Sequence, residues 1–117
     1  MTHYMNLKSR PFDMIAIGTK TIELRLNDEK RRAIKAGDSI VFTETTDQNR
    51  QITAEVVKLH NFQSFLELYK ALPLDKCGYL PEELPAASYK DMEEYYSADK
   101  QARYGVLGIE IRVVGIE

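Results

Sequence analysis

The sequence predicts an α+β fold in which a small sheet of mixed, mostly antiparallel strands curls or closes into a barrel and is flanked by short helices. Segments of alternating polar and apolar residues, typical of strands, are interleaved with segments of helical periodicity. The connection between the strands expected at residues 39–43 and 51–59 is too short for a crossover helix, which favours antiparallel pairing. The chain has 117 residues, close to the commonest size of one domain, so we expect a single domain over residues 1–117.

The first elements lead to the clearest strand pattern in the chain. Residues 4–8 alternate weakly and predict a strand. Pro11 fits the first turn of a following helix, where its missing N–H costs nothing, and Gly18 is placed to end that helix in the left-handed conformation. Residues 21–26 then alternate strictly between polar and apolar side chains, which predicts a strand with one apolar face.

A short helix and two more strands follow. The pair Asn27-Asp28 is suited to cap a short helix that extends to Ile34. After a turn, residues 39–43 and residues 51–59 predict two strands. The adjacent Val56-Val57 in the second of these strands indicates either a bulge or burial on both faces.

The last third of the chain combines helices with an irregular segment. The apolar stripe of the first helix is Phe62, Phe65, Leu66 and Tyr69. Three prolines and a glycine predict mostly loop over residues 73–87. Ser88 with Asp91 resembles a capping signal for a second helix, and residues 104–115 alternate as the final strand.

The composition narrows the class of protein. A net charge of −2 argues against holding nucleic acid by bulk charge, although a local basic cluster is compatible with it. The only cysteine, Cys77, excludes a disulfide within the chain and favours a reducing, cytoplasmic location. No apolar run has the length of a signal peptide or a membrane span, so we expect no membrane partner. His3 and His60 lack partners at metal-ligand spacing and no phosphate-loop motif is present, so we expect neither a metal nor a cofactor.

Charged residues gather where the strictly alternating strand begins. Lys20 lies at its entrance, and Thr21, Glu23 and Arg25 share its polar face. Lysine and arginine suit phosphate or carbonyl oxygens, whereas a glutamate accepts hydrogen bonds from a base edge or acts as a general base. The spacing alone favours a simpler interpretation, in which this is the solvated face of the strand and Glu23 and Arg25 form a local ion pair.

Two further patterns are candidates for nucleic-acid contact. Tyr95-Tyr96, followed by Lys100, combines rings that stack on unpaired bases with a cation that holds phosphate. An equally weighted interpretation packs one tyrosine in the core and leaves Lys100 as ordinary surface charge. The basic run at residues 29–32 is suited to a nucleic-acid backbone, but the solvated side of a short helix is the favoured interpretation.

The pattern Gly18-x-Lys20-x-x-Glu23-x-Arg25 matches the G-x-K-x-x-E-x-R signature of ASCH domains, the activating-signal-cointegrator homology group. Further segments look like the same family in the same order, so the resemblance covers nearly the whole chain; they are residues 8–12, 37–42, 95–97 and 104–109. The resemblance implies a PUA-like β-barrel with helices beside a cleft that carries the motif. It also implies that this cleft binds RNA or a nucleotide and that Lys20, Glu23 and Arg25 line it.

Three functional hypotheses follow. The first is a binding module for RNA or a nucleotide-like small molecule, whose site residues are Lys20, Thr21, Glu23, Arg25, Tyr96 and Lys100. The second is a small amidohydrolase acting on a modified nucleoside such as N4-acetylcytidine, with Lys20 and Glu23 as the catalytic pair. The enzymatic branch of the family has a threonine where this chain has Glu23, so we favour binding over catalysis. The third is a protein-interaction adaptor in transcription or translation regulation, which exposed apolar area around residues 73–87 would favour.

Overall fold

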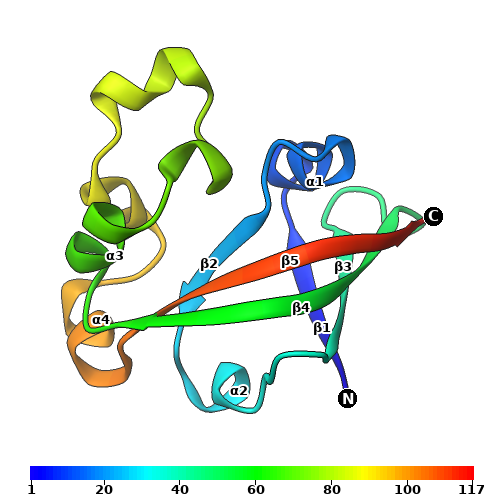
Figure 1. The fold of residues 1–117 in the computed structure, drawn as a ribbon, viewed down its shortest axis with the longest axis horizontal. Coiled ribbons are helices and arrows are strands. Elements are labelled where there is room, and N and C mark those ends of the chain that lie inside the picture. Colours follow the sequence, from blue (N-terminus) through cyan, green and yellow to red (C-terminus); the bar gives the residue numbers. More distant parts are fainter.

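The computed structural model describes residues 1–117 and builds five strands into one sheet. The strands are β1 (Thr2–Leu7), β2 (Ile22–Leu26), β3 (Ser39–Glu44), β4 (Gln51–Phe62) and β5 (Val106–Ile116). Their order across the sheet is β1-β3-β4-β5-β2, and β1 pairs with β3 in parallel while the other neighbours are antiparallel. The sheet curls into a half-barrel, with β1 and β2 as its two edges (Figure 1). The predicted α+β fold with a mixed, mostly antiparallel sheet is therefore confirmed.

Short helices flank this sheet. They are α1 (Ser9–Ile17), α2 (Glu29–Arg32), α3 (Phe65–Ala71), α4 (Ala98–Tyr104) and the 3₁₀ helices η1 (Leu74–Lys76), η2 (Pro81–Ala86) and η3 (Tyr89–Glu94). Figure 1 shows α1 above the sheet, right of centre, whereas α3, α4 and the 3₁₀ helices gather on the left. None of the helices combines the length and the apolar character that crossing a membrane requires.

The main core fills the concave side of the half-barrel. It contains 13 buried residues, among them Phe12 and Ile15 of α1 and Phe42 of β3, each with no exposed surface. The α1 helix ends as the sequence predicts, because Gly18 adopts a φ of 89° and its N–H donates to the Ile15 carbonyl at 3.1 Å. This tight end turns the chain directly into β2.

A second cluster of seven buried residues lies under α3. The alternating apolar residues of β2 (Ile22, Leu24 and Leu26) belong to it. They pack with Phe65 and Leu68 of α3. Because the apolar face of β2 is used here, its polar face is directed to the other side of the strand.

Two details of the predicted β4–α3 segment differ in the structure. The register shifts between Val56 and Lys58, so the bulge is confirmed, but Val57 is 49% exposed and burial on both faces is wrong. Phe62 is the last residue of β4, because strand pairing with β5 continues to that point. The helix therefore starts only after Ser64, whose side chain caps it, and the residues it buries are Phe65 and Leu68.

The segment that follows α3 is more regular than the sequence indicates. Residues 73–87, predicted as mostly loop, contain η1 and η2. Ser88 does cap a helix, with Asp91 completing a capping box, but this helix is the 3₁₀ helix η3. The prediction missed α4, which the Ser97 side chain caps and which includes Tyr104, so the final strand begins at Val106.

Candidate functional site

Glu23 is clamped between the two cations of the G-x-K-x-x-E-x-R motif. Lys20 Nζ lies 2.7 Å from Glu23 Oε1, and Arg25 Nε donates to Glu23 Oε2 at 2.6 Å. Glu23 is only 4% exposed and Lys20 only 8%. The interpretation of this segment as a solvated strand face is therefore wrong, although the ion pair of Glu23 with Arg25 that it included is confirmed. The three side chains form a buried ion triad, called the motif triad below.

The backbone on both sides holds the motif triad in place. The N–H groups of Thr19 and Lys20 both donate to the Met14 carbonyl, at 3.0 and 3.1 Å, which fixes the turn after α1. In β2, Glu23 and Arg25 are held in register by antiparallel pairing with β5. Arg25 Nη2 also donates to the Asn6 carbonyl at 2.8 Å, and thereby links the two edge strands of the half-barrel.

The electrostatics keep Glu23 and Arg25 charged. Burial raises the pKa of Glu23, but Lys20 and Arg25 outweigh it and hold that pKa below the ordinary value of 4.5. Burial likewise lowers the pKa of Arg25, and the Glu23 carboxylate more than compensates, so the guanidinium pKa is raised. The motif triad thus carries one surplus positive charge.

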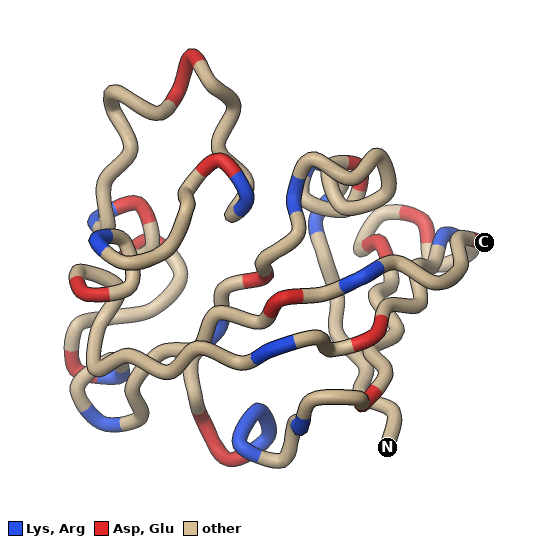
Figure 2. Tube along the Cα trace, viewed as in Figure 1, with Lys and Arg blue, Asp and Glu red and all other residues tan.

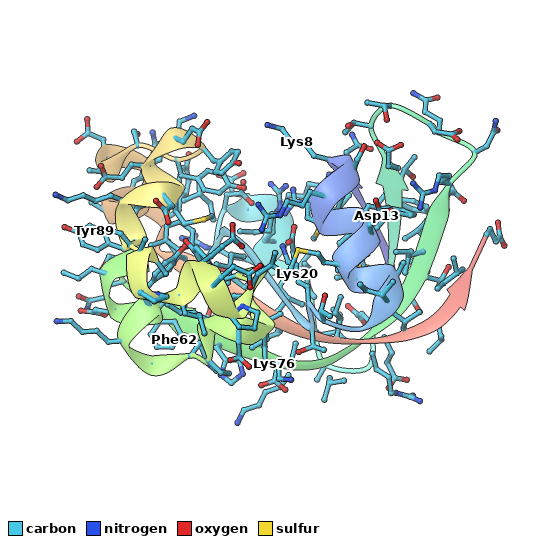
Figure 3. The ribbon with its side chains drawn as sticks, turned by 90° about the horizontal axis from the view of Figure 1, so that it is seen from above. Lys8, Asp13, Lys20, Phe62, Lys76 and Tyr89 are labelled. Atoms are coloured by element: carbon cyan, nitrogen blue, oxygen red, sulfur yellow. The ribbon has the colours of Figure 1, made fainter.

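The motif triad lies at a cleft of about 490 Å³. One wall comes from the end of β1 and from α1, and the other from α3 and residues 77–79 and 91–96. Lys20 lies between α1 and the 3₁₀ helices in Figure 3. The Lys8 ammonium, 5.3 Å from the Tyr95 ring centre, joins the two walls, and the ion pair of Arg10 with Glu83 ties α1 to η2.

The wall opposite α1 carries polar groups that the sequence did not indicate. Tyr69 and Tyr79 share a hydrogen bond of 2.7 Å between their hydroxyls, and the Tyr79 hydroxyl donates to Asp91 at 2.6 Å. Burial raises the pKa of the Tyr69 hydroxyl to about 12, so it stays protonated. Gly78 has a φ of 111°, and a Cβ there would meet Lys20 Cδ at 3.5 Å. In the sequence, Gly78 was the only sign of this wall, because a residue without a Cβ permits the close approach of the Lys20 side chain.

Four of the six site residues expected from sequence meet in the cleft. Lys20, Glu23, Arg25 and Tyr96 line it, and Tyr96 also stacks on Phe65 at 5.9 Å, so it belongs partly to the core. Thr21 and Lys100 do not line it.

Both exceptions have a physical reason. Thr21 precedes the first residue of β2, and its N–H donates to the Lys76 carbonyl at 2.9 Å, so the alternation of the strand does not yet apply. Lys100 lies on the exposed surface of α4, the helix that the sequence reading missed.

The histidines and the cysteine lie apart from this chemistry. His3 contacts Asp38 at 2.8 Å and His60 contacts Glu110 at 2.6 Å. No group of three or more His, Cys, Asp or Glu side chains is arranged to hold a metal ion. Cys77 lines the cleft, but burial raises the pKa of its thiol to about 12, so it is not a thiolate nucleophile near neutral pH.

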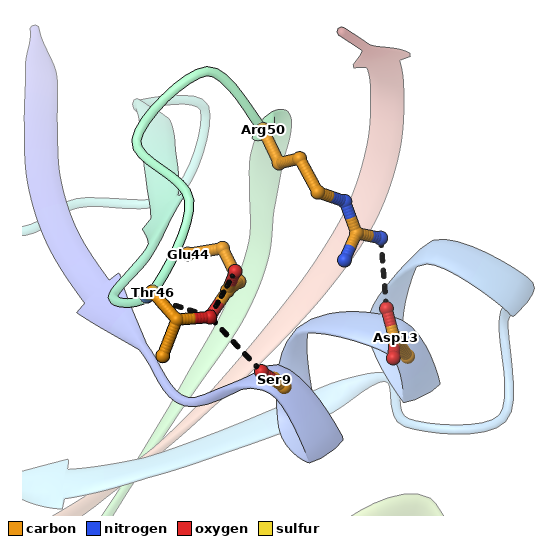
Figure 4. Close-up of polar contacts among 5 residues, drawn as sticks. All are labelled: Ser9, Asp13, Glu44, Thr46 and Arg50. Atoms are coloured by element: carbon orange, nitrogen blue, oxygen red, sulfur yellow. Dashed lines mark hydrogen bonds and ion pairs between the residues drawn. The ribbon is translucent and has the colours of Figure 1, made fainter.

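The α1 wall is anchored on the side away from the cleft (Figure 4). Glu44 is only 2% exposed, and its carboxylate accepts from Ser9 Oγ at 3.0 Å and from the Thr46 N–H at 2.8 Å. Arg50 pairs with Asp13 at 2.8 Å. These contacts tie the first two turns of α1 to the β3–β4 connection, so the wall has a fixed position relative to the sheet.

A curled half-barrel of mixed strands with a polar cleft beside its edge strands defines a small PUA-like domain. The family model of the ASCH domain matches residues 5–115, and the chain belongs to the ASCH domain family. The resemblance read from the motif is thereby confirmed.

Solved structures agree with this assignment. The hypothetical protein PH0355 is 31% identical, with a TM-score of 0.80 over 97% of this chain and 100% of its own. Protein PF0455 from Pyrococcus furiosus is 30% identical, with a TM-score of 0.71 over 97% and 98% of the two chains. ASCH from Zymomonas mobilis, 16% identical with a TM-score of 0.64 over 95% of this chain and 66% of its own, shares the fold. No curated protein matches the sequence.

Proposed function

We propose that the cleft binds RNA or a nucleotide-like ligand through the motif triad. The observation that carries the proposal is the buried clamp of Glu23 by Lys20 and Arg25 at the cleft. Burying charges is costly even when they are paired, so such a cluster seldom serves stability alone. Buried, perturbed ionisable groups in a cleft are the usual mark of a functional site.

The hydrogen-bonding capacity of the motif triad fits a nucleotide. Lys20 has three donors and its ion pair with Glu23 uses one of them. Arg25 donates through Nε and Nη2, which leaves its Nη1 hydrogens for a ligand. These donors suit the carbonyl oxygen of a base or a phosphate oxygen. The ring of Tyr95, 55% exposed at the cleft, supplies a face on which an unpaired base stacks.

The size and charge of the cleft favour an unpaired ligand. Its volume of about 490 Å³ lies inside the range of roughly 300–1,000 Å³ that small-molecule sites occupy. A net charge of −2 does not support extended contact with a duplex backbone. We place this function in the cytoplasm, which the single, unpaired Cys77 supports.

The geometry favours binding over hydrolysis of a modified nucleoside such as N4-acetylcytidine. A general base works best with a pKa near the operating pH, whereas the pKa of Glu23 is lowered and both of its oxygens already accept from cations. Incubation with N4-acetylcytidine and chromatography of the products tests this directly. We expect no turnover above that of a Lys20→Met variant.

The structure adds little support to the adaptor hypothesis. Leu80 and Leu84 are only 38% and 37% exposed, which is ordinary for a protein surface.

The test is an NMR titration of the isotope-labelled protein with nucleosides, nucleoside monophosphates and short single-stranded RNA. We expect shifts centred on Lys20, Glu23 and Arg25. Arg25→Lys keeps the charge that balances Glu23 but loses the planar fork, so it should weaken binding about tenfold, since a hydrogen bond to a charged group contributes about 1.5–3 kcal/mol. Lys58→Ala, which removes an exposed lysine of β4, is the matched control. A flat response across the whole panel, or shifts that avoid the cleft, would refute the proposal.

A further inference from the structure

Two basic helices lead out of the cleft, one from each side of the proposed site. β2 carries Arg25 and continues into α2 after only Asn27 and Asp28. Tyr96, which lines the cleft, continues into α4 after only Ser97. Both helices are therefore attached to the proposed ligand site by a few residues of extended chain. An extended residue spans roughly 3.3 Å.

The two helices meet beyond the cleft. Arg32 Nη2 of α2 donates to the carbonyl of Tyr104, the last residue of α4, at 3.3 Å. The N–H of Asn27 donates to the carbonyl of Gly105 at 3.0 Å. In the view of Figure 2, the basic positions of α2 and α4 both lie in the lower part of the molecule. The exposed Lys30, Arg32, Lys100 and Arg103 therefore belong to one region, called the α2–α4 basic patch.

Charged groups of the cleft and of the α2 region meet at the Tyr96 ring. Burial raises the pKa of the Tyr96 hydroxyl; Arg25 and Arg31 act to lower it, and Glu23 and Asp28 act to raise it, so both regions lie near this ring. Arg31 pairs with Asp28 at 2.9 Å and so neutralises that carboxylate, whereas Lys30 and Arg32 form no ion pair. Residues 28–35 carry four cations and two carboxylates, a local surplus in a chain whose net charge is negative.

We infer that the ligand is a single strand of RNA rather than a free nucleotide: one unpaired base occupies the cleft, and the neighbouring phosphates lie on the α2–α4 basic patch. The inference rests on the proposed function of the cleft and adds the class of ligand. An aromatic-lined pocket for a base, flanked by exposed cations at the spacing of a few residues, is the arrangement by which proteins hold single strands. Lys100, which does not line the cleft, acquires a role as a phosphate contact.

The experiment compares two probes on the same variants. The first is a fluorescein-labelled single-stranded RNA of roughly eight nucleotides and mixed sequence, a length within the usual site size of single-strand binders. The second is the set of four ribonucleoside monophosphates. Lys30→Ala combined with Lys100→Ala removes two patch cations whose side chains make no hydrogen bond or ion pair, so the fold is retained. Lys58→Ala combined with Lys70→Ala removes two exposed lysines of β4 and α3 and is the matched control.

We expect the patch variant to bind the RNA severalfold more weakly and to lower the slope of log affinity against log salt by about 0.7 for each lost phosphate contact. Its affinity for the monophosphates should not change, and the control should behave as the wild type with both probes. The inference would be overturned if the patch variant kept the RNA affinity and the salt slope of the wild type. If Arg25→Lys still weakened binding in that case, the proposed function would stand. Failure of the wild-type protein to bind either probe would overturn both.

Discussion

Glu23→Gln is the sharpest test of the motif triad as a buried ionic unit. The substitution keeps the shape of the side chain but removes the charge that Lys20 and Arg25 share at 2.7 and 2.6 Å. Two cations are then left without their counter-ion in a place where the carboxylate is only 4% exposed. Breaking a buried pair by removing one partner costs about 3–5 kcal/mol. We expect the lower end, about 3 kcal/mol, because the glutamine oxygen still accepts one hydrogen bond.

Thermal and denaturant unfolding measure this loss. For a domain of this size about 3 kcal/mol corresponds to a fall in Tm of roughly 12 °C. Adding Lys20→Met to Glu23→Gln removes one orphaned cation and should restore part of the stability, with a coupling free energy of about 0.5–3 kcal/mol between the two positions. A loss below about 0.5 kcal/mol, typical of surface substitutions, would show that water already solvates the motif triad and that our account of its burial is wrong.

Three other features give independent predictions. The hydrogen bond from His3 lowers the pKa of Asp38 from 3.8 to about 2, so its stabilisation is complete above about pH 4 and is lost as the pH falls through about 2; Asp38→Asn should flatten that part of an acid-unfolding curve. Gly105→Ala should lower the free energy of unfolding by about 1–3 kcal/mol, because φ is 75° and the new Cβ would meet the Phe62 carbonyl oxygen at 3.0 Å. A free energy of unfolding equal to that of the wild type would contradict this. The buried Cys77 thiol, with its pKa raised to about 12, should react with a thiol reagent at pH 8 many times more slowly in the native protein than in denaturant, and equal rates would refute its burial.

Local patterns predicted the sheet well because each of them acts over a few residues. Strict alternation placed β2, and Gly18 placed the end of α1 through the left-handed conformation that it adopts. The prediction failed where a distant partner decides the outcome. Phe62 looked like the start of a helix, but pairing with Val106, 44 positions later in the sequence, keeps it in β4. The 3₁₀ helices η1 and η2 were missed because their short turns have no apolar period to detect, whereas the helix predicted after Ser88 is found as η3.

Only the motif residues of the candidate site could be predicted from the sequence. Two residues apart on a strand, Glu23 and Arg25 had to face the same way, and the family motif pointed to Lys20. Nothing local shows that this face is buried, because the residues covering it come from α1 and from the 3₁₀ segment. The Tyr69–Tyr79–Asp91 chain was missed for the same reason, since it is assembled by tertiary folding of residues that show no common pattern.

The hydrogen bond from Arg25 to the Asn6 carbonyl has a consequence for how the molecule behaves at high concentration. A half-barrel leaves one edge of β1 and one edge of β2 without a neighbouring strand. Such edges are templates on which strands of other chains add, and proteins commonly block them with charged side chains. Arg25 occupies one backbone acceptor of β1, the Asn6 carbonyl, and places a cation between the two edges. A variant without this guanidinium should therefore self-associate more readily, so the solubility of the domain and its proposed ligand site depend on the same side chain.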